Sequence, residues 1–370
     1  MAAQSGRGGS RVWRGEAFQV KLSTAALPGI ALGLGGGLLG VVLAPLAPGL
    51  HMGLVGLGLG LVFPLSMYIV FTGSLKSGAP RRGVEALAPV LAVSSAILSL
   101  LLYLAGLPWR PLAASALAFL GLHTLLQLVG WRRREPRWPL LYPPIAGAVS
   151  LALPLEGLGV VELMLRIGLY LDAPMILVVS LYTVARNYGR RPTSQLMAAV
   201  LAPNALALAL AILGLGLHAT LALAGLLAYY PALGLHRAPE LLRRASRLPG
   251  PAGGTLRYMA ASHLLTIPPM LLSLHPQATM LVKLHLLYIG FIGVHIILHA
   301  PLLLPQVARV KLSKNYQPIP PALLSAGAIV RAVAPDVSYI IVLAALAAAA
   351  VQFRPEGVVG TRGLAGPRRS

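Results

Sequence analysis

The sequence predicts an all-α, multi-pass membrane protein, organised as one bundle of about twelve transmembrane helices. Three observations lead to this prediction: 57% of the residues are hydrophobic, only 11% are charged, and the mean hydropathy is +0.78. A soluble globular surface cannot be built from so few charged residues. Apolar windows of about 20 residues recur along the chain, and each is long enough to cross a bilayer as a helix.

The first ten apolar windows follow one another with short connections. We expect spans at 25–46, 51–73, 85–107, 110–131, 139–155, 157–185, 194–216, 217–236, 256–275 and 279–305. The segment 320–353 is too long for one ordinary span, and Pro335 interrupts it, which favours two short spans with a turn near that proline. One span preceded by an interfacial helix is the alternative, so the total is twelve or eleven.

The formal net charge of +21 has a regular distribution along the chain. Basic residues gather before the first span and after every second span, in the connections at 76–82, 132–137, 186–191, 237–247 and 309–314. Such an asymmetry predicts that the N-terminus and these connections are cytoplasmic. We therefore expect a multi-pass protein of the cell membrane whose basic charge faces lipid and cytoplasm, with no nucleic-acid partner.

Composition also divides the chain and limits its chemistry. The segments 1–22 and 354–370 are rich in Gly, Ser, Pro and Arg, so we expect disordered tails on either side of a single transmembrane domain at 23–353. The chain has no cysteine. Disulfides and thiolate ligands are therefore excluded, and any metal or haem must be bound by His, Met, Tyr or carboxylates.

Two histidines lie at matching depth in the second and tenth spans. His51 and His285 both fall toward the outer face, and each is followed five residues later by a glycine, Gly56 or Gly290. Two imidazoles on facing helices can bind the iron of a b-type haem, and small residues can leave the apolar slot that the macrocycle needs. The alternative is that each histidine bonds a neighbouring helix or lies at the headgroup boundary.

Further histidines predict a second site. At 100° per residue, His285 and His299 are about 40° apart, so they share one helix face with His295. With His263 and His123 from other spans, His295 and His299 could bind copper or a second haem. Interhelical hydrogen bonds are the alternative. The remaining three histidines lie at span ends and are expected to be interfacial: His218, His236 and His275.

The few acidic residues within spans indicate a proton path. Glu162 and Arg166 are one turn apart and can neutralise each other. Asp172 lies deeper in the same span and is a candidate proton relay, or a neutral acid that is hydrogen-bonded between helices. The chain contains no Walker motif, catalytic triad, H-E-x-x-H zinc site or paired-aspartate prenyltransferase motif, which argues against a hydrolase, an ATPase or a lipid transferase.

The stretch "HLLYIGFIGVHIILHAPLLLPQV" with the later "AGAIVRAVAPDVSYIIVLAAL" resembles the C-terminal part of the NnrS-like proteins and, more remotely, the core subunit of haem-copper oxidases. The resemblance implies about twelve helices with haem b between the second and tenth, His51 and His285 as ligands, and Arg331 binding the propionates. It also implies electron transfer with a membrane or soluble partner, haem or metal handling, or a nitric-oxide response. A snorkelling position at a helix end is the alternative for Arg331.

One departure from the oxidases leaves a second function open. The spans 157–185 and 194–216 contain no histidine, although an oxidase binds copper there, so we do not expect a complete oxygen-reducing enzyme. The alternative is a cofactor-free, proton-coupled transporter or channel, in which Asp172, Glu162 and the histidines line the path.

Overall fold

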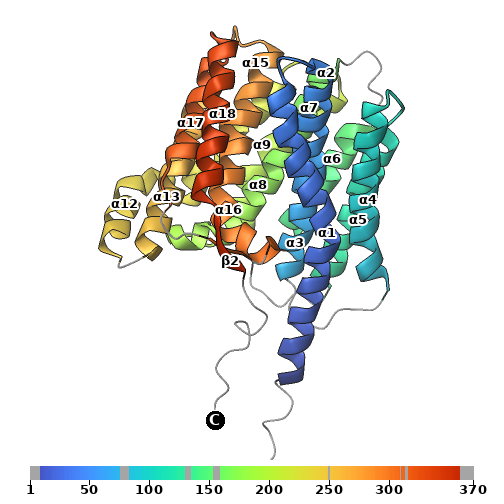
Figure 1. The fold of residues 1–370 in the computed structure, drawn as a ribbon, viewed down its shortest axis with the longest axis vertical. Coiled ribbons are helices and arrows are strands. Elements are labelled where there is room, and N and C mark those ends of the chain that lie inside the picture. Colours follow the sequence, from blue (N-terminus) through green and yellow to red (C-terminus); the bar gives the residue numbers. More distant parts are fainter. Residues whose placement is uncertain are drawn as a thin grey trace, which may run out of the picture. The chain divides into compact units, whose positions relative to one another are not determined.

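The computed structural model describes residues 9–75, 83–129, 135–152, 159–248, 251–308, 310–312 and 316–358 (Figure 1). In these segments every regular element is a helix except one pair of short strands. The chain divides into two units, Met1–Leu233 and Gly234–Ser370. The prediction of an all-α fold is thereby confirmed for the part of the chain that the structure describes.

Eight helical segments of the described chain are long and apolar enough to cross a membrane: Thr24–Leu43, Pro48–Leu75, Glu85–Leu104, Arg110–Leu128, Val160–Thr183, Ser194–Ile212, Met280–Pro305 and Pro335–Gln352. A ninth is added if the bent pair His218–Leu233 and Leu235–Arg247 counts as one span. The other predicted spans coincide with shorter or broken helices. One break falls at Thr266, next to two successive prolines that lack the N–H of a continuous helix.

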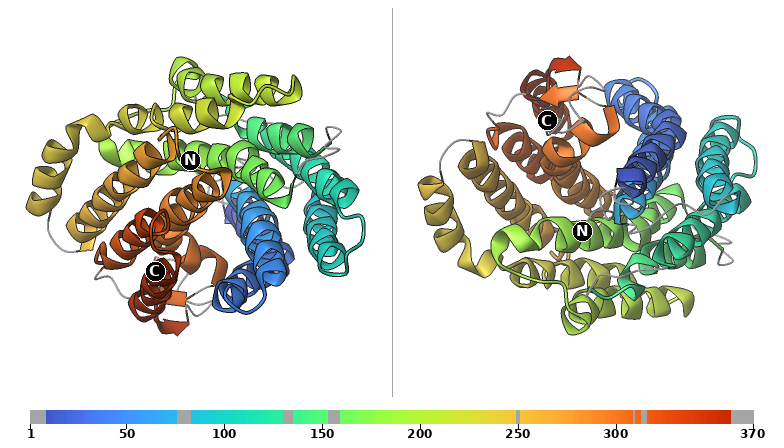
Figure 2. Two further views of the ribbon diagram at one scale, coloured as in Figure 1. Left: turned by 90° about the horizontal axis from the view of Figure 1, so that it is seen from above. Right: turned by 90° about the horizontal axis from the view of Figure 1, so that it is seen from below.

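The first unit is helical from its first described residue. It begins with α1 (Gly9–Leu43), α2 (Pro48–Gly53), the π-helix η1 (Leu54–Val62) and α3 (Phe63–Leu75). It continues with α4 (Val84–Leu104), α5 (Arg110–Leu128), the short 3₁₀-helix η2 (Trp138–Leu140) and α6 (Tyr142–Ala152). It ends with α7 (Val160–Ile167), the π-helix η3 (Gly168–Asp172), α8 (Ala173–Thr183), η4 (Ala185–Tyr188), α9 (Ser194–Ile212), α10 (His218–Leu226) and α11 (Tyr229–Leu233). The helices α4 and α5 lie side by side in both views of Figure 2.

Small residues bring α1 unusually close to η1. A Cβ atom on Gly33 would lie 2.6 Å from the backbone nitrogen of Phe63 and 2.7 Å from the carbonyl oxygen of Gly58. Glycine therefore allows the two backbones to pack directly against each other, as is common between membrane helices.

The second unit consists of η5 (Leu235–Arg237), α12 (Ala238–Arg247), α13 (Pro251–Leu265), α14 (Ile267–Ser273), α15 (Met280–His285), the π-helix η6 (Leu286–Gly293), α16 (Val294–Ala308), β1 (Val310–Leu312), α17 (Ile319–Val330), α18 (Pro335–Gln352) and β2 (Pro355–Val358). The helices α17 and α18 form a hairpin. Its turn lies between Val330 and Pro335, as the sequence predicts, and the Ser338 hydroxyl donates to the Gly327 carbonyl across it, 2.8 Å away.

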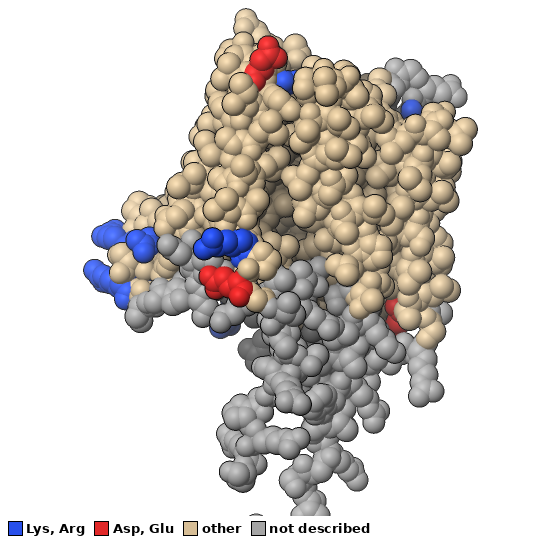
Figure 3. Space-filling model, in the orientation of Figure 1, with Lys and Arg blue, Asp and Glu red and all other residues tan. Residues whose placement is uncertain are grey.

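Three segments differ from expectation. The helix α1 begins at Gly9, so residues 9–22 are helical rather than disordered, because a helix that is nucleated in a span propagates outward easily. The predicted C-terminal tail begins with β2, which pairs antiparallel with β1 and so satisfies its backbone groups. Residues 1–8 and 359–370 lie outside the described chain. The predicted basic connection at 237–247 contains the amphipathic helix α12, over which basic side chains gather in Figure 3.

Candidate functional site

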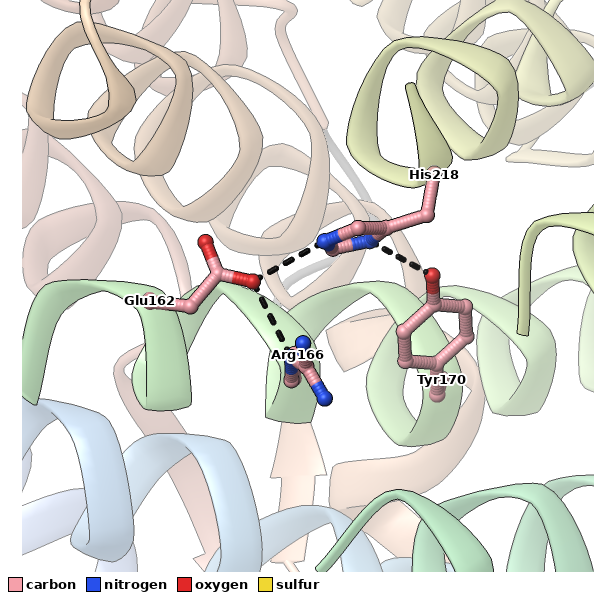
Figure 4. A network of polar contacts seen from close by, with 4 residues as sticks. All are labelled: Glu162, Arg166, Tyr170 and His218. Carbon is pink, nitrogen blue, oxygen red and sulfur yellow. Dashed lines mark hydrogen bonds and ion pairs between the residues drawn. The ribbon is translucent and has the colours of Figure 1, made fainter. Parts of the chain in front are cut away.

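Four polar side chains meet inside the first unit: Glu162, Arg166, Tyr170 and His218 (Figure 4). The Oε1 atom of Glu162 lies 3.0 Å from Nε of Arg166 and 3.0 Å from Nε2 of His218. The other ring nitrogen of His218, Nδ1, lies 2.9 Å from the Tyr170 hydroxyl. The four groups therefore form one continuous chain of contacts, from the guanidinium to the phenol.

Local structure explains how these residues come together. Glu162 and Arg166 are separated by one helical turn on α7, and Tyr170 follows a further turn along, on η3. His218 is the first residue of α10. The side chains of Arg166 and His218 are only 6% and 5% exposed, and that of Glu162 is 15% exposed, so the contacts are shielded from water.

Hydrogen-bond chemistry assigns the protons of this network. A carboxylate only accepts hydrogen bonds, so Nε2 of His218 carries the hydrogen that it donates to Glu162. In the neutral imidazole, Nδ1 then accepts the hydroxyl hydrogen of Tyr170. A second proton on Nδ1 reverses that bond, because the imidazolium donates to the Tyr170 oxygen. The network can therefore accept one additional proton without losing a hydrogen bond.

A π-helical turn supports the network. The Nδ2 atom of Asn204 on α9 donates to the carbonyl of Leu169 in η3, 2.8 Å away, and its Oδ1 accepts from the Tyr142 hydroxyl, also at 2.8 Å. Asp172, the predicted relay residue, ends the same π-helical turn and is 1% exposed. In a π-helical turn the backbone hydrogen bonds run to the fifth residue instead of the fourth, and such turns are frequent at functional sites.

The second unit brings together three of the four histidines predicted to bind metal. The ring centroids of His263 on α13 and of His295 and His299 on α16 are 5.3–6.4 Å apart. Each Nδ1 lies 2.7–2.9 Å from the carbonyl oxygen four residues earlier, so each Nδ1 carries a hydrogen. Among the described residues, no group of three or more histidines or carboxylates could hold a metal ion. Copper binding stays a prediction that this arrangement does not support.

The prediction that His285 shares a helix face with His299 assumed a continuous α-helix. The eight residues of η6 lie between them, and π-helical hydrogen bonds run to the fifth residue rather than the fourth, so the rotation of 100° per residue does not hold across this segment. The two histidines also differ in burial, since His299 is 5% exposed whereas His285 is half-buried.

His51 and His285 belong to different units, and each bonds a backbone carbonyl through Nδ1. The acceptor for His51 is Gly40, 3.0 Å away, and for His285 it is Leu281, 2.7 Å away. Both histidines thus keep Nε2 as the nitrogen with a lone pair, as a haem ligand requires.

The expected slot for a macrocycle is not formed by the glycines beside these histidines. A Cβ on Gly53 would lie 2.6 Å from the Tyr103 ring, and one on Gly56 would lie 2.2 Å from the Met164 sulfur. A Cβ on Gly290 would lie 2.4 Å from Pro269. These glycines accommodate neighbouring protein side chains, so the residues present do not fit a haem at these helix faces.

Two further predicted site residues have other surroundings. His123 is fully buried on α5 in the first unit, so it is not on the helices that form the three-histidine cluster of the second unit. Arg331 ends α17, and its Nη1 donates to the Pro335 carbonyl, 3.2 Å away. This contact closes the turn of the α17–α18 hairpin.

The sequence interpretation missed His218, which it assigned to the interface. His236 and His275 are exposed as expected, whereas His218 is buried against Glu162 and Tyr170. The predicted topology did contain a signal, because His218 and Glu162 lie one and five residues after the predicted starts of their spans, at 217 and 157, and both spans begin at the same membrane face.

No protein-family model, curated protein or solved structure matches this chain. The resemblance to NnrS-like proteins therefore stays a prediction.

Proposed function

We propose that this chain is a proton-coupled transporter that needs no cofactor. Its topology would comprise twelve spans in the cell membrane with the N-terminus in the cytoplasm, as the basic connections favour. In that topology α7 and α10 both begin at the outer face, which agrees with the meeting of Glu162 and His218 near the starts of these helices.

The observation that carries the proposal is the 3.0 Å contact between His218 Nε2 and Glu162 Oε1 within the buried network. Ionisable groups are costly inside a membrane, and they usually mark an ion or proton pathway. Histidine is also the side chain that most readily changes charge between pH 5 and 8. A proton that arrives at His218 would pass along its imidazole to the Tyr170 hydroxyl, and the buried Asp172 offers a second position deeper in the same span.

Arg166 compensates the charge of the carboxylate in this proton relay. Its guanidinium compensates the charge of Glu162, so the pair is neutral and His218 can gain or lose a proton without leaving an isolated carboxylate. Glu162 in turn orients the ring of His218 through Nε2, which presents Nδ1 to Tyr170.

The test is proton movement in proteoliposomes that contain the purified full chain and an internal pH-sensitive dye. Solutes are added one at a time from a panel of small anions, cations, amino acids and sugars, under an inward proton gradient. We expect at least one solute to accelerate internal acidification, and Glu162→Gln and His218→Gln to reduce this acceleration at least tenfold. Matched controls are Glu240→Gln and His275→Gln, which change the same residue types at exposed positions.

Two results would overturn the proposal. One is an acidification rate equal to that of protein-free liposomes for every solute. The other is an undiminished rate in His218→Gln. A reduced b-type haem spectrum that disappears in both His51→Ala and His285→Ala would instead support haem binding and an electron-transfer partner.

A further inference from the structure

Arg166 has unused hydrogen-bonding capacity at a buried position. The residue is 5% exposed, and its Nε donates to Glu162. Its two terminal amino groups, Nη1 and Nη2, make no hydrogen bond to any part of the chain that the structure describes. Together they carry four N–H donors and no acceptor. Neither amino group is completely enclosed by protein, so a ligand that brings acceptor oxygens can reach this end of the guanidinium and bind donors that the protein leaves unused.

The charge of the network indicates which ligand it would take. Arg166 and Glu162 cancel, so the network is neutral when His218 is neutral. A proton alone would leave one positive charge, and a monovalent anion alone would leave one negative charge. Both together restore neutrality. Because an uncompensated charge is costly in the membrane interior, binding of either favours binding of the other.

We propose that Arg166 binds a small monovalent oxyanion, either a carboxylate or an inorganic oxyanion, together with a proton on His218. This inference rests on the proposed function and names its substrate class. The two terminal amino groups of Arg166 match the paired oxygens of such an anion in a bidentate arrangement, which an ammonium group cannot provide.

The groups around His218 are consistent with this coupling. The elements that pack against α10 include α9, α11 and η3, and α7 supplies the ion pair. Their charged or titratable side chains are Glu162, Arg166, Tyr170, Asp172, Tyr229 and Tyr230; α9 carries none. In this set Arg166 is the permanent cation and His218 is the group on α10 that gains a proton.

The first experiment measures binding to the purified full chain in detergent, with nitrate and acetate as probes. Intrinsic tryptophan fluorescence or calorimetry gives the Kd at pH 7.5 and pH 5.5. We expect at least one probe to bind about tenfold or more tightly at pH 5.5, with uptake of about one proton per anion in weakly buffered solution. His218→Gln should remove the pH dependence.

Variants of Arg166 separate anion recognition from folding. Arg166→Lys keeps the charge but loses the bidentate geometry, and it should weaken binding at least tenfold. The double variant Glu162→Gln/Arg166→Gln removes both charges, so it leaves no uncompensated ion, and it should abolish binding. Arg257→Gln, at an exposed position on α13, is the matched control and should bind like the wild type.

Three outcomes would overturn the inference: no binding of either probe, binding that is independent of pH, or unchanged binding in the double variant. These failures can be told apart from failure of the proposed function. If a sugar, an amino acid or a cation drives proton movement in proteoliposomes while neither anion binds, the transporter proposal stands and the oxyanion assignment is wrong.

Discussion

The contact between α1 and η1 provides a direct test of the packing in the first unit. We predict that Gly33→Ala destabilises the protein, because its Cβ would meet backbone atoms of Phe63 and Gly58 at 2.6 and 2.7 Å. Ordinary contact begins at 3.4 Å, so the helices would have to separate by about 0.8 Å. Backbone atoms of a regular helix cannot rotate away as a flexible side chain can. Overpacking of this kind typically costs about 1–3 kcal/mol.

Gly35→Ala is the matched control, because it lies on the same helix and its Cβ would have no neighbour within 4 Å. Both substitutions gain the same helix-propensity term of about 1 kcal/mol, so the difference between them isolates the steric cost. The free energy of unfolding is measured by titration of the purified protein with dodecyl sulfate, followed by circular dichroism. Equal unfolding free energies for the two variants would refute the close approach of α1 and η1.

The same titration checks three further predictions. Asn204→Ala should cost about 1–3 kcal/mol, because it leaves a buried π-helical carbonyl without its donor and the part-buried Tyr142 hydroxyl without its acceptor. Gly214 has φ of +71° and open space around it, so Gly214→Ala should cost about 1–2 kcal/mol, and Gly214→Asn should cost less because asparagine tolerates left-handed backbone. Tyr258→Phe should cost about 1 kcal/mol, because the hydroxyl donates to a backbone carbonyl of α16 at 2.8 Å, whereas Tyr103→Phe should cost little.

Hydropathy and proline placement predicted much of the helical organisation. The long spans coincide with helices, and the turn of the last hairpin lies between Val330 and Pro335, because proline cannot continue a helix that needs its N–H. These features depend on residues close in sequence, so a single sequence contains them. The helical part of the first predicted tail and the strand β2 were not predicted. Composition alone does not show how far a helix extends beyond a span, or whether a segment pairs with a distant strand.

The polar site could be predicted only in part. The spacing of Glu162 and Arg166 gave their pairing, whereas the contact with His218 joins residues 56 positions apart in sequence. The π-helical turn could not be predicted from the local sequence either. The hydrogen bond to the Leu169 carbonyl that supports it comes from Asn204, on another helix. Among the described residues three spans contain π-helical segments, so arithmetic at 100° per residue cannot assign helix faces beyond each of them.

The exposed ion pair of Arg237 and Glu240 and the buried pair of Arg166 and Glu162 differ in what they can contribute to stability. Arg237 and Glu240 are 59% and 55% exposed, and such surface pairs contribute little to stability. The pair of Arg166 and Glu162 is buried, and replacement of a buried pair by apolar residues of similar size is often neutral or stabilising. Stability alone therefore does not explain a polar network at this position.

The buried network itself can be replaced by apolar side chains. The single change Glu162→Leu should destabilise the protein by about 3–5 kcal/mol, because it leaves the Arg166 charge buried without compensation. The triple change Glu162→Leu, Arg166→Met and His218→Leu should restore stability to near the wild-type value, while solute-driven proton movement in proteoliposomes is lost. A triple variant that stays as unstable as the single one would show that the network holds the helices together. Recovery of stability without recovery of proton movement is the pattern expected if these residues serve transport.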